Sequence, residues 1–164
     1  MLPTPALVVL VFVGSLLTFT HGQTDAIQAD LVAKAREELA ALVKSDGPLA
    51  ESSLRASNDL AKRLLGAGTA ASIMESEALF RSTLASQTST LGANHKATLA
   101  SLSNLAYLLE HHGGDLEEAY EYAVKAADGF AFFYGEDHTS TTLVKRNLDR
   151  LQKRMGKQGW RTEL

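Results

Sequence analysis

The sequence predicts an all-α protein, and three observations support that fold class. Apolar residues recur at helical spacing along the chain, without the alternation that marks strands. Alanine and leucine are the two most frequent residues, and both favour helices. The only prolines are Pro3, Pro5 and Pro48, and glycines follow the apolar stripes. We therefore expect about six helices joined by short glycine-marked turns, and no sheet.

The first three expected helices end at breaks that contain glycine. These breaks are Asp46-Gly47-Pro48, then Gly66 and Gly68, then Leu91-Gly92. Each helix carries one apolar stripe that we expect to face inward. The stripes are Ile27, Leu31, Ala35, Leu39 and Leu42 in the first helix; Leu54, Ala61, Leu64 and Leu65 in the second, which starts near Leu49; and Ile73, Leu79, Phe80 and Leu84 in the third.

The last three expected helices have similar limits. The fourth ends at His112-Gly113-Gly114, and Asp115 is expected to cap the fifth, because its carboxylate can accept from the first free N–H groups. The fifth continues to Tyr134-Gly135 and the sixth stops at Gly156. The inward residues are Leu99, Leu102, Leu105, Ala106 and Leu109 in the fourth helix and Val144, Leu148, Leu151 and Met155 in the sixth.

Two stretches of the chain, LGANHKATLASLSNL and YGEDHTSTTLVKRNL, repeat one pattern 43 positions apart. The offset joins Gly92 to Gly135, His95 to His138, Thr98 to Thr141 and Asn104 to Asn147. A fixed offset over several landmarks indicates duplication of a helix pair. Because one such pair cannot bury its apolar face alone, stacking of neighbouring pairs is expected to supply the core.

His95 and His138 could mark either a doubled catalytic or metal site, or the start of each helix pair. Glu136 and Asp137 stand beside His138, whereas Ala93 and Asn94 stand beside His95. A doubled site would not vary its second group in this way, and one metal would need further ligands within reach of both. We therefore expect the histidines to cap helices or pack in turns. His111-His112 is interpreted likewise as a polar helix end.

Three motifs resemble the tetratricopeptide repeats of kinesin light chains. They are Leu91-Gly92-Ala93-Asn94-His95, Ser101-Leu102-Ser103-Asn104-Leu105-Ala106 and Gly114-Asp115-Leu116-Glu117-Glu118-Ala119. The resemblance covers about Glu77–Leu148 and is weak over Leu49–Glu75. It implies a short array of antiparallel helix pairs with right-handed superhelical stacking: one leading helix, two pairs and one closing helix.

The resemblance also implies a binding face. The matching asparagines of such repeats lie on the concave side and can bond the backbone of an extended peptide, which makes Asn104 and Asn147 the leading candidates. A hydrogen bond between neighbouring repeats is an equally weighted alternative for both. Ser101 and Ser103 flank the same face, and Lys145 and Arg146 begin a basic run that favours either solvent or an acidic partner segment.

The two ends of the chain suggest a route through the secretory pathway. Ala6–Leu17 is too short for a bilayer span, which needs about 20 residues, but it suits a signal peptide cleaved after Gly22; an uncleaved anchor is the alternative. The last residues, Arg161, Thr162, Glu163 and Leu164, resemble the Lys-Asp-Glu-Leu retrieval signal of the endoplasmic reticulum. The expected organisation is a signal peptide over 1–22, a helical repeat domain over 23–156 and a tail over 157–164.

Composition narrows the function further. The chain has no cysteine, which excludes disulfides and zinc-thiolate sites, and a net charge of -3 gives no reason to propose nucleic acid as a partner. No catalytic, phosphate-binding or cofactor motif is recognisable, so we expect neither an enzyme nor a cofactor or metal. The expected function is protein or peptide binding in the lumen of the endoplasmic reticulum, with no membrane span after cleavage. An accessory substrate-binding subunit of a luminal enzyme and a secreted helical ligand are the alternatives.

The fifth helix concentrates aromatic residues near its end. Phe132-Phe133-Tyr134 is more ring surface than one helical face can bury. Most aromatic side chains of this helix are expected in the core, and part of this trio is a secondary candidate for a binding patch.

Overall fold

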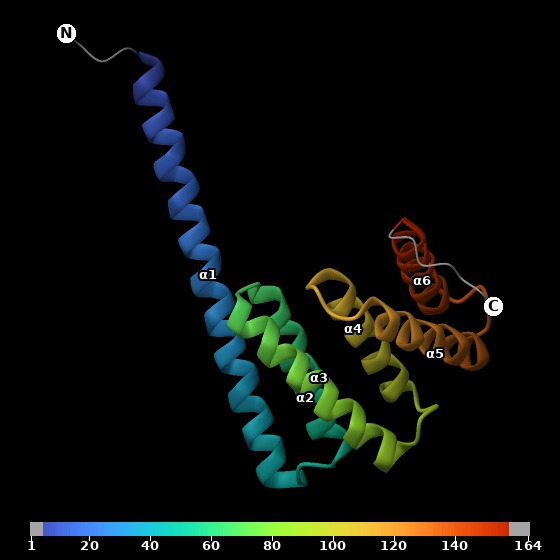
Figure 1. Cartoon of the computed structure of the whole chain (residues 1–164). Coiled ribbons are helices and arrows are strands. Elements are labelled where there is room, and N and C mark those ends of the chain that lie inside the picture. Colours follow the sequence, from blue (N-terminus) through green and yellow to red (C-terminus); the bar gives the residue numbers. More distant parts are fainter. Residues whose placement is uncertain (1–4, 158–164) are drawn as a thin grey trace.

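The computed structural model describes the backbone of residues 5–157 and the side chains of residues 24–156. Within that part the chain forms six helices, joined by short turns, and no strand. Consecutive helices run antiparallel (Figure 1). They are α1 (Pro5–Asp46), α2 (Glu51–Ala67), α3 (Ala70–Leu91), α4 (Lys96–His111), α5 (Leu116–Tyr134) and α6 (Thr139–Lys157). The predicted all-α array is confirmed, with its turns close to the expected positions.

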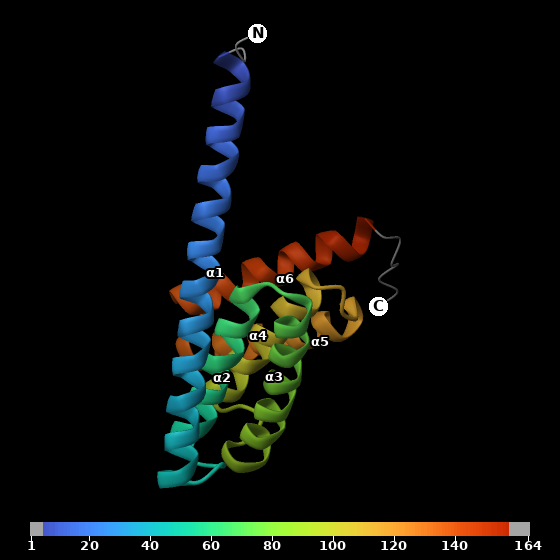
Figure 2. The same ribbon diagram turned by 90° about the vertical axis from the view of Figure 1, so that its left-hand side faces the viewer.

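The helices form two layers. Each helix packs on the next one along the chain, and α2 also contacts α4, which in turn contacts α6. We call α2, α4 and α6 the inner layer, and α1, α3 and α5 the outer layer. The amino-terminal part of α1 projects away from the other five helices (Figures 1 and 2).

The predicted stripes supply most of the core. Every predicted residue of the α4 stripe is buried, as are Leu54, Ala61 and Leu64 of α2 and Phe80 of α3. The central cluster joins helices of both layers: Ala61, Phe80, Leu105, Ala106, Leu108, Leu109, Ala119, Ala123 and Leu151.

The prediction for Ile27 is wrong, because its side chain is 55% exposed. The α1 residues that pack in the core cluster with α2 and α3 are Val32, Ala35 and Leu39. Ile27 comes before these residues in α1, nearer to the amino-terminal part that projects from the other helices. Helical periodicity alone could not show where neighbouring helices stop covering α1.

Glycine is required at two kinds of place in this array. Gly47, Gly92 and Gly135 follow outer-layer helices with φ of +92°, +93° and +84°, a region that side chains disfavour. Within α5, a Cβ on Gly129 would lie 2.4 Å from the Leu99 side chain. Gly129 therefore permits the close approach of α5 to α4.

The first expected helix pair, over which the sequence resemblance is weak, has the same turn contact as the second pair. Ser53 Oγ donates to the Gly47 carbonyl at 2.7 Å, and Thr98 Oγ1 donates to the Gly92 carbonyl at 2.8 Å. Gly47 and Ser53 lie 45 positions before their counterparts, Gly92 and Thr98, whereas the two later copies are 43 positions apart. The first copy thus carries two extra residues, which hide it from a fixed-offset comparison.

Candidate functional site

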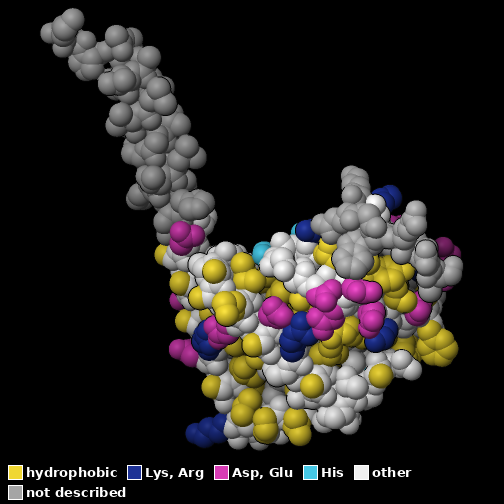
Figure 3. Space-filling model, viewed as in Figure 1, with side chains coloured by type: hydrophobic (Ala, Val, Ile, Leu, Met, Phe, Trp, Pro, Cys, Tyr) yellow, Lys and Arg dark blue, Asp and Glu magenta, His cyan; other side chains and the backbone are white. Residues whose placement is uncertain are grey.

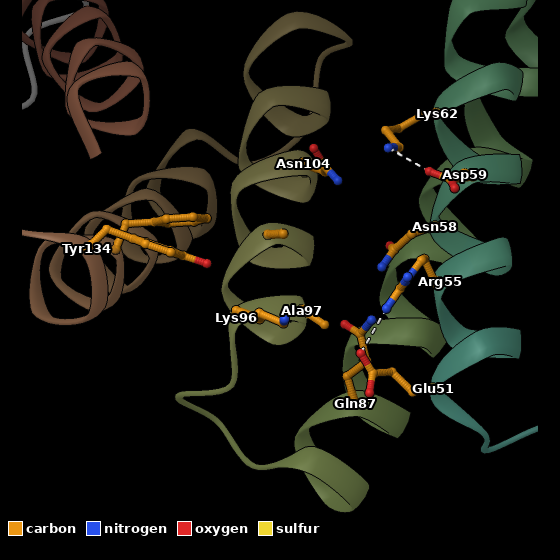
Figure 4. Close-up of a pocket in the computed structure, with 12 residues that line it drawn as sticks. Glu51, Arg55, Asn58, Asp59, Lys62, Gln87, Lys96, Ala97, Asn104 and Tyr134 are labelled. Atoms are coloured by element: carbon orange, nitrogen blue, oxygen red, sulfur yellow. Dashed lines mark hydrogen bonds and ion pairs between the residues drawn. The ribbon is translucent and has the colours of Figure 1, made fainter. Parts of the chain in front are cut away.

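A groove of about 410 Å³ lies between α2 and α4. Figure 4 shows side chains of α2 and α4 facing the space between these helices, with Gln87 reaching in from the end of α3, while Tyr134 of α5 lies on the other side of α4 from α2. We call it the inner groove. Its lining is Glu51, Arg55, Asn58, Asp59, Lys62, Gln87, Lys96, Ala97, Ala100, Asn104, Phe130 and Tyr134.

Charged and neutral polar groups share the inner groove. Arg55 pairs with Glu51 at 3.0 Å and Lys62 pairs with Asp59 at 2.7 Å, so both acidic residues of the groove are neutralised. Lys96 forms no ion pair within the described part of the chain. The groove therefore carries one uncompensated positive charge.

The structure separates the two asparagines that the repeat makes equivalent. Asn104 points into the inner groove and makes no hydrogen bond to another described residue (Figure 4). Asn147 and Ser103 instead line the contact between α4 and α6, where only about 10 Å³ remains open. Of the two predicted asparagines, Asn104 alone faces a space large enough for a ligand.

Ser101 lies beneath the inner groove rather than on its surface. Its side chain is fully buried, and its hydroxyl joins two amides: Asn58 Nδ2 donates to Ser101 Oγ at 2.7 Å, and Ser101 Oγ donates to Gln87 Oε1 at 2.6 Å. The prediction that Ser101 contacts a partner directly is therefore corrected. We call these three residues the amide network.

The amide network is incomplete. Asn58 Oδ1 and Gln87 Nε2 are buried and have no hydrogen-bond partner. An unpaired buried polar atom is unfavourable, because it has lost its bonds to water without replacing them. Neither amide was predicted from the sequence, because the family resemblance is weak over the segment that contains Asn58 and no recognised motif includes Gln87. Aligning Leu60-Ala61 with Leu105-Ala106 places Asn58 opposite Ser103, a predicted binding residue, and could have indicated it.

An ion pair and further polar contacts join α4 to α6. Glu110 is only 3% exposed, and Arg150 donates to both of its carboxylate oxygens, at 3.0 and 2.8 Å. Arg154 donates to the Glu110 backbone carbonyl. The Arg150 guanidinium also lies 5.8 Å from the centre of the Tyr107 ring. These contacts hold α6 against α4 and were not foreseen from the sequence.

The predicted basic residues occupy two settings on α6. Lys145 pairs with Glu136 in the preceding turn. Arg146 lines an open basic hollow of about 450 Å³, together with Asp149, Arg150, Lys153 and Arg154. Neither residue lines the inner groove.

A second groove, of about 530 Å³, lies between α4, α5 and the turn before α4. Leu99 and Leu102 lie in its lining, with Phe132 and Phe133. Phe132 is 82% exposed and meets Phe133 edge to face, with ring centres 5.2 Å apart. The expected surplus of ring surface is thus present at the end of α5.

The histidines cap their helices. His95 Nδ1 accepts from the Ala97 amide at 3.3 Å, and His138 Nδ1 accepts from the Ser140 amide at 3.1 Å. His111 Nδ1 lies 2.9 Å from the Tyr107 carbonyl oxygen in the last turn of α4. The capping interpretation is therefore confirmed for His95 and His138.

Ion pairs link the outer-layer helices. Arg36 of α1 meets Glu75 of α3 at 2.6 Å, and Arg81 of α3 holds both oxygens of Glu118 of α5, at 2.6 and 2.7 Å. Acidic and basic side chains gather across the middle of the face seen in Figure 3. Arg81, with a smaller contribution from Tyr122, lowers the pKa of Glu118 to about 2.

The described residues offer neither a membrane-spanning helix nor a metal site. No helix there combines the length and apolar character of a membrane span. Nor do three His, Cys, Asp or Glu side chains of that part converge as metal ligands would. The predicted retrieval residues, Arg161–Leu164, lie outside the described residues.

Comparison with known proteins identifies the architecture. No family model and no curated protein sequence matches the chain. Its structure is similar to a crystal structure of a protein from Podosopora anserina, described as a kinesin light chain with nearly identical TPR-like repeats. The TM-score is 0.73, with 22% identity over 84% of this chain and 64% of that chain. The chain has a tetratricopeptide-like repeat fold.

A crystal structure of a single-substitution variant of that protein gives an equal TM-score of 0.73 and 22% identity, over 84% of this chain and 63% of that one. The tetratricopeptide-like array of this chain thus spans just under two thirds of the length of these structures. At this level of identity the likeness concerns the fold. It agrees with the resemblance that the sequence motifs indicated.

Proposed function

We propose that this array is a non-catalytic module that binds a protein or peptide, with an extended partner segment held in the inner groove. The observation that carries the proposal is the position of Asn104, whose amide faces about 410 Å³ of open groove. An asparagine amide offers both an N–H donor and a C=O acceptor, which match the two polar groups of a peptide backbone.

The charge in the groove favours a partner with an acidic side chain. Lys96 has no carboxylate partner among the described residues, whereas Arg55 and Lys62 are each paired. A carboxylate of the partner placed near Lys96 would neutralise the uncompensated positive charge of the groove. Because the array is short and its groove is open to solvent, we expect modest affinity, with orientation set by polar contacts.

A displayed library of random peptides, selected against the intact protein, tests this proposal. The matched variants Ala100→Trp and Ala93→Trp fill the inner groove and the second groove respectively. We expect the selected peptides to lose binding to Ala100→Trp and to keep it with Ala93→Trp. The proposal fails if the library yields no binder, or if binding survives Ala100→Trp. Thermal unfolding of both variants confirms that each is folded.

We further propose that the module works in the lumen of the endoplasmic reticulum, on the strength of the signal-like first 22 residues and of Arg161–Leu164. A tagged protein in secretory cells should be retained, and the same protein without its last four residues should appear in the medium. Secretion of both forms would leave a secreted protein instead. Retention of both forms would show that these four residues are not the retrieval signal.

A further inference from the structure

We propose that Asn58 and Gln87 act together as an acceptor and a donor for one amide group of the segment bound in the inner groove. This rests on the proposed function and names the ligand chemistry at one end of that groove. Asn58 Oδ1 and Gln87 Nε2 are the unpaired atoms, and both side chains line the groove. Gln87 is only 1% exposed.

The unpaired groups remain one donor and one acceptor when both amides are turned over. Both amides bond to one hydroxyl, Ser101 Oγ, which donates one hydrogen bond and accepts another. If both amides were turned over, Gln87 would donate to the hydroxyl and Asn58 would accept from it. One N–H donor and one C=O acceptor would again be left. Either arrangement is complementary to an amide.

The fold does not require this polar network. At the next junction, 43 positions on, Gln87 is replaced by Phe130 and Ser101 by Val144. Val144 is buried and Phe130 packs against its cluster. Apolar contact thus replaces the glutamine and the hydroxyl at that place, and Ser103 stands where the first junction has Asn58. A buried amide network with unpaired atoms is therefore a particular feature of the α2–α4 junction.

An exposed ion pair, Arg55–Glu51, lies beside the two amides. Figure 4 shows the ends of Asn58, Arg55, Glu51 and Gln87 gathered at one end of the groove. The Arg55 side chain is 70% exposed and its bond to Glu51 spans one helical turn. Such exposed pairs contribute little to stability. A ligand at this end of the groove can therefore displace Arg55 at little cost and without moving a helix.

Small amides test the ligand chemistry without a partner protein. We would follow the side-chain amide signals of the intact protein by NMR while adding N-methylacetamide, which resembles a peptide group, or acetamide, which resembles an Asn or Gln side chain. The signals of Asn58 and Gln87 should shift together and saturably with at least one of these, and the one that acts identifies the source of the amide. N,N-dimethylacetamide, which has no N–H, should shift them less.

Two results would overturn the proposal. The signals would stay unmoved by every amide if the pair holds only water, or they would respond equally to N,N-dimethylacetamide if binding is merely apolar. Gln87→Met should abolish the response at Asn58. Gln152→Met, in an exposed part of α6, is the matched control and should leave the response unchanged.

A scan of a selected peptide separates this inference from the proposed function. For a peptide-group source, one backbone amide-to-ester replacement should weaken binding about tenfold, and Gln87→Met should remove that difference. For a side-chain source, replacing one Asn or Gln of the peptide should do the same. Suppose that Ala100→Trp abolishes binding of a peptide, but that Gln87→Met removes the effect of none of the peptide's replacements. This result would refute the inference and leave the proposed function standing. If small amides shift the NMR signals of Asn58 and Gln87 but the library yields no peptide binder, the proposed function is refuted and the amide-binding pair is kept.

Discussion

The two junctions of the inner layer occupy equivalent places and differ in what fills them. Between α2 and α4 the amide network leaves two polar atoms unpaired and an open groove of about 410 Å³. Between α4 and α6 the Glu110–Arg150 pair is complete and about 10 Å³ is open. Neighbouring side chains, rather than the repeat geometry, therefore decide which junction leaves an open groove.

The outer layer shows no such contrast. Arg36–Glu75 and Arg81–Glu118 join successive outer helices by the same kind of ion pair. The outer layer thus supplies a uniform connection, and the difference between the junctions is confined to the inner layer. Single substitutions at each of these places should therefore differ in how much stability they remove.

Arg150→Ala should produce the largest loss of stability. Because Glu110 is nearly fully buried, removing its bidentate partner leaves a poorly compensated carboxylate, at a cost of about 2–3 kcal/mol. Urea unfolding measures the change. Arg146→Ala, on the same helix but in the open basic hollow, is the matched control and should change stability by less than about 0.5 kcal/mol. Equal effects would contradict a special role for the Glu110 contact.

Ser101→Ala should cost about 1–2 kcal/mol, because it leaves Asn58 Nδ2 and Gln87 Oε1 unpaired as well. Adding Asn58→Leu and Gln87→Met should recover most of that loss, since an apolar set has no unpaired atoms. Thermal unfolding of the single and triple variants makes the comparison. A triple variant less stable than Ser101→Ala would show that the amide network stabilises the junction.

Glu118→Gln should lower stability by about 1 kcal/mol at neutral pH, a figure reduced for solvent screening of a partly exposed pair. The folded-state pKa of Glu118 is lowered to about 2. The contribution of Glu118 to the free energy of unfolding is therefore complete above about pH 4.5, the usual pKa of glutamate, and is lost as the pH falls towards 2. Unfolding curves of wild type and variant should converge over that window. A constant difference would exclude the Arg81 pair as its cause.

Replacing Phe132 and Phe133 with Ser and Thr should have the smallest effect. The preceding repeat has Ser89 and Thr90 at the equivalent positions, and the Phe132 and Phe133 side chains are 82% and 50% exposed. We expect stability to stay within about 0.5 kcal/mol, as judged by urea unfolding. A larger loss would place the rings in the structural core rather than on a free surface.

The fold could be predicted because its signals are local. The glycine turns, the capping groups at His95 and Asp115 and the apolar stripe of α4 each follow from short stretches of sequence. The matching copies at Gly92 and Gly135 then indicated the order of the helices.

The site could be predicted only in part, because it depends on residues far apart in the chain. Asn104 was found through the repeat, but Asn58 and Gln87 reach the same groove from α2 and α3. Ser101 was placed on the right face and at the wrong depth, since a helical pattern does not show which side chains a neighbouring helix covers. Glu110 and Arg150 lie 40 positions apart, and no local pattern joins them.

The proposed binding site is best tested by the affinity of one selected peptide for Asn104→Ala and for Asn147→Ala. The two asparagines are repeat equivalents, one facing the inner groove and the other the closed junction. We expect Asn104→Ala to weaken binding about tenfold, whereas Asn147→Ala should change it less than about twofold. Equal losses in both variants, or a loss in Asn147→Ala alone, would contradict the assignment of the inner groove as the binding site.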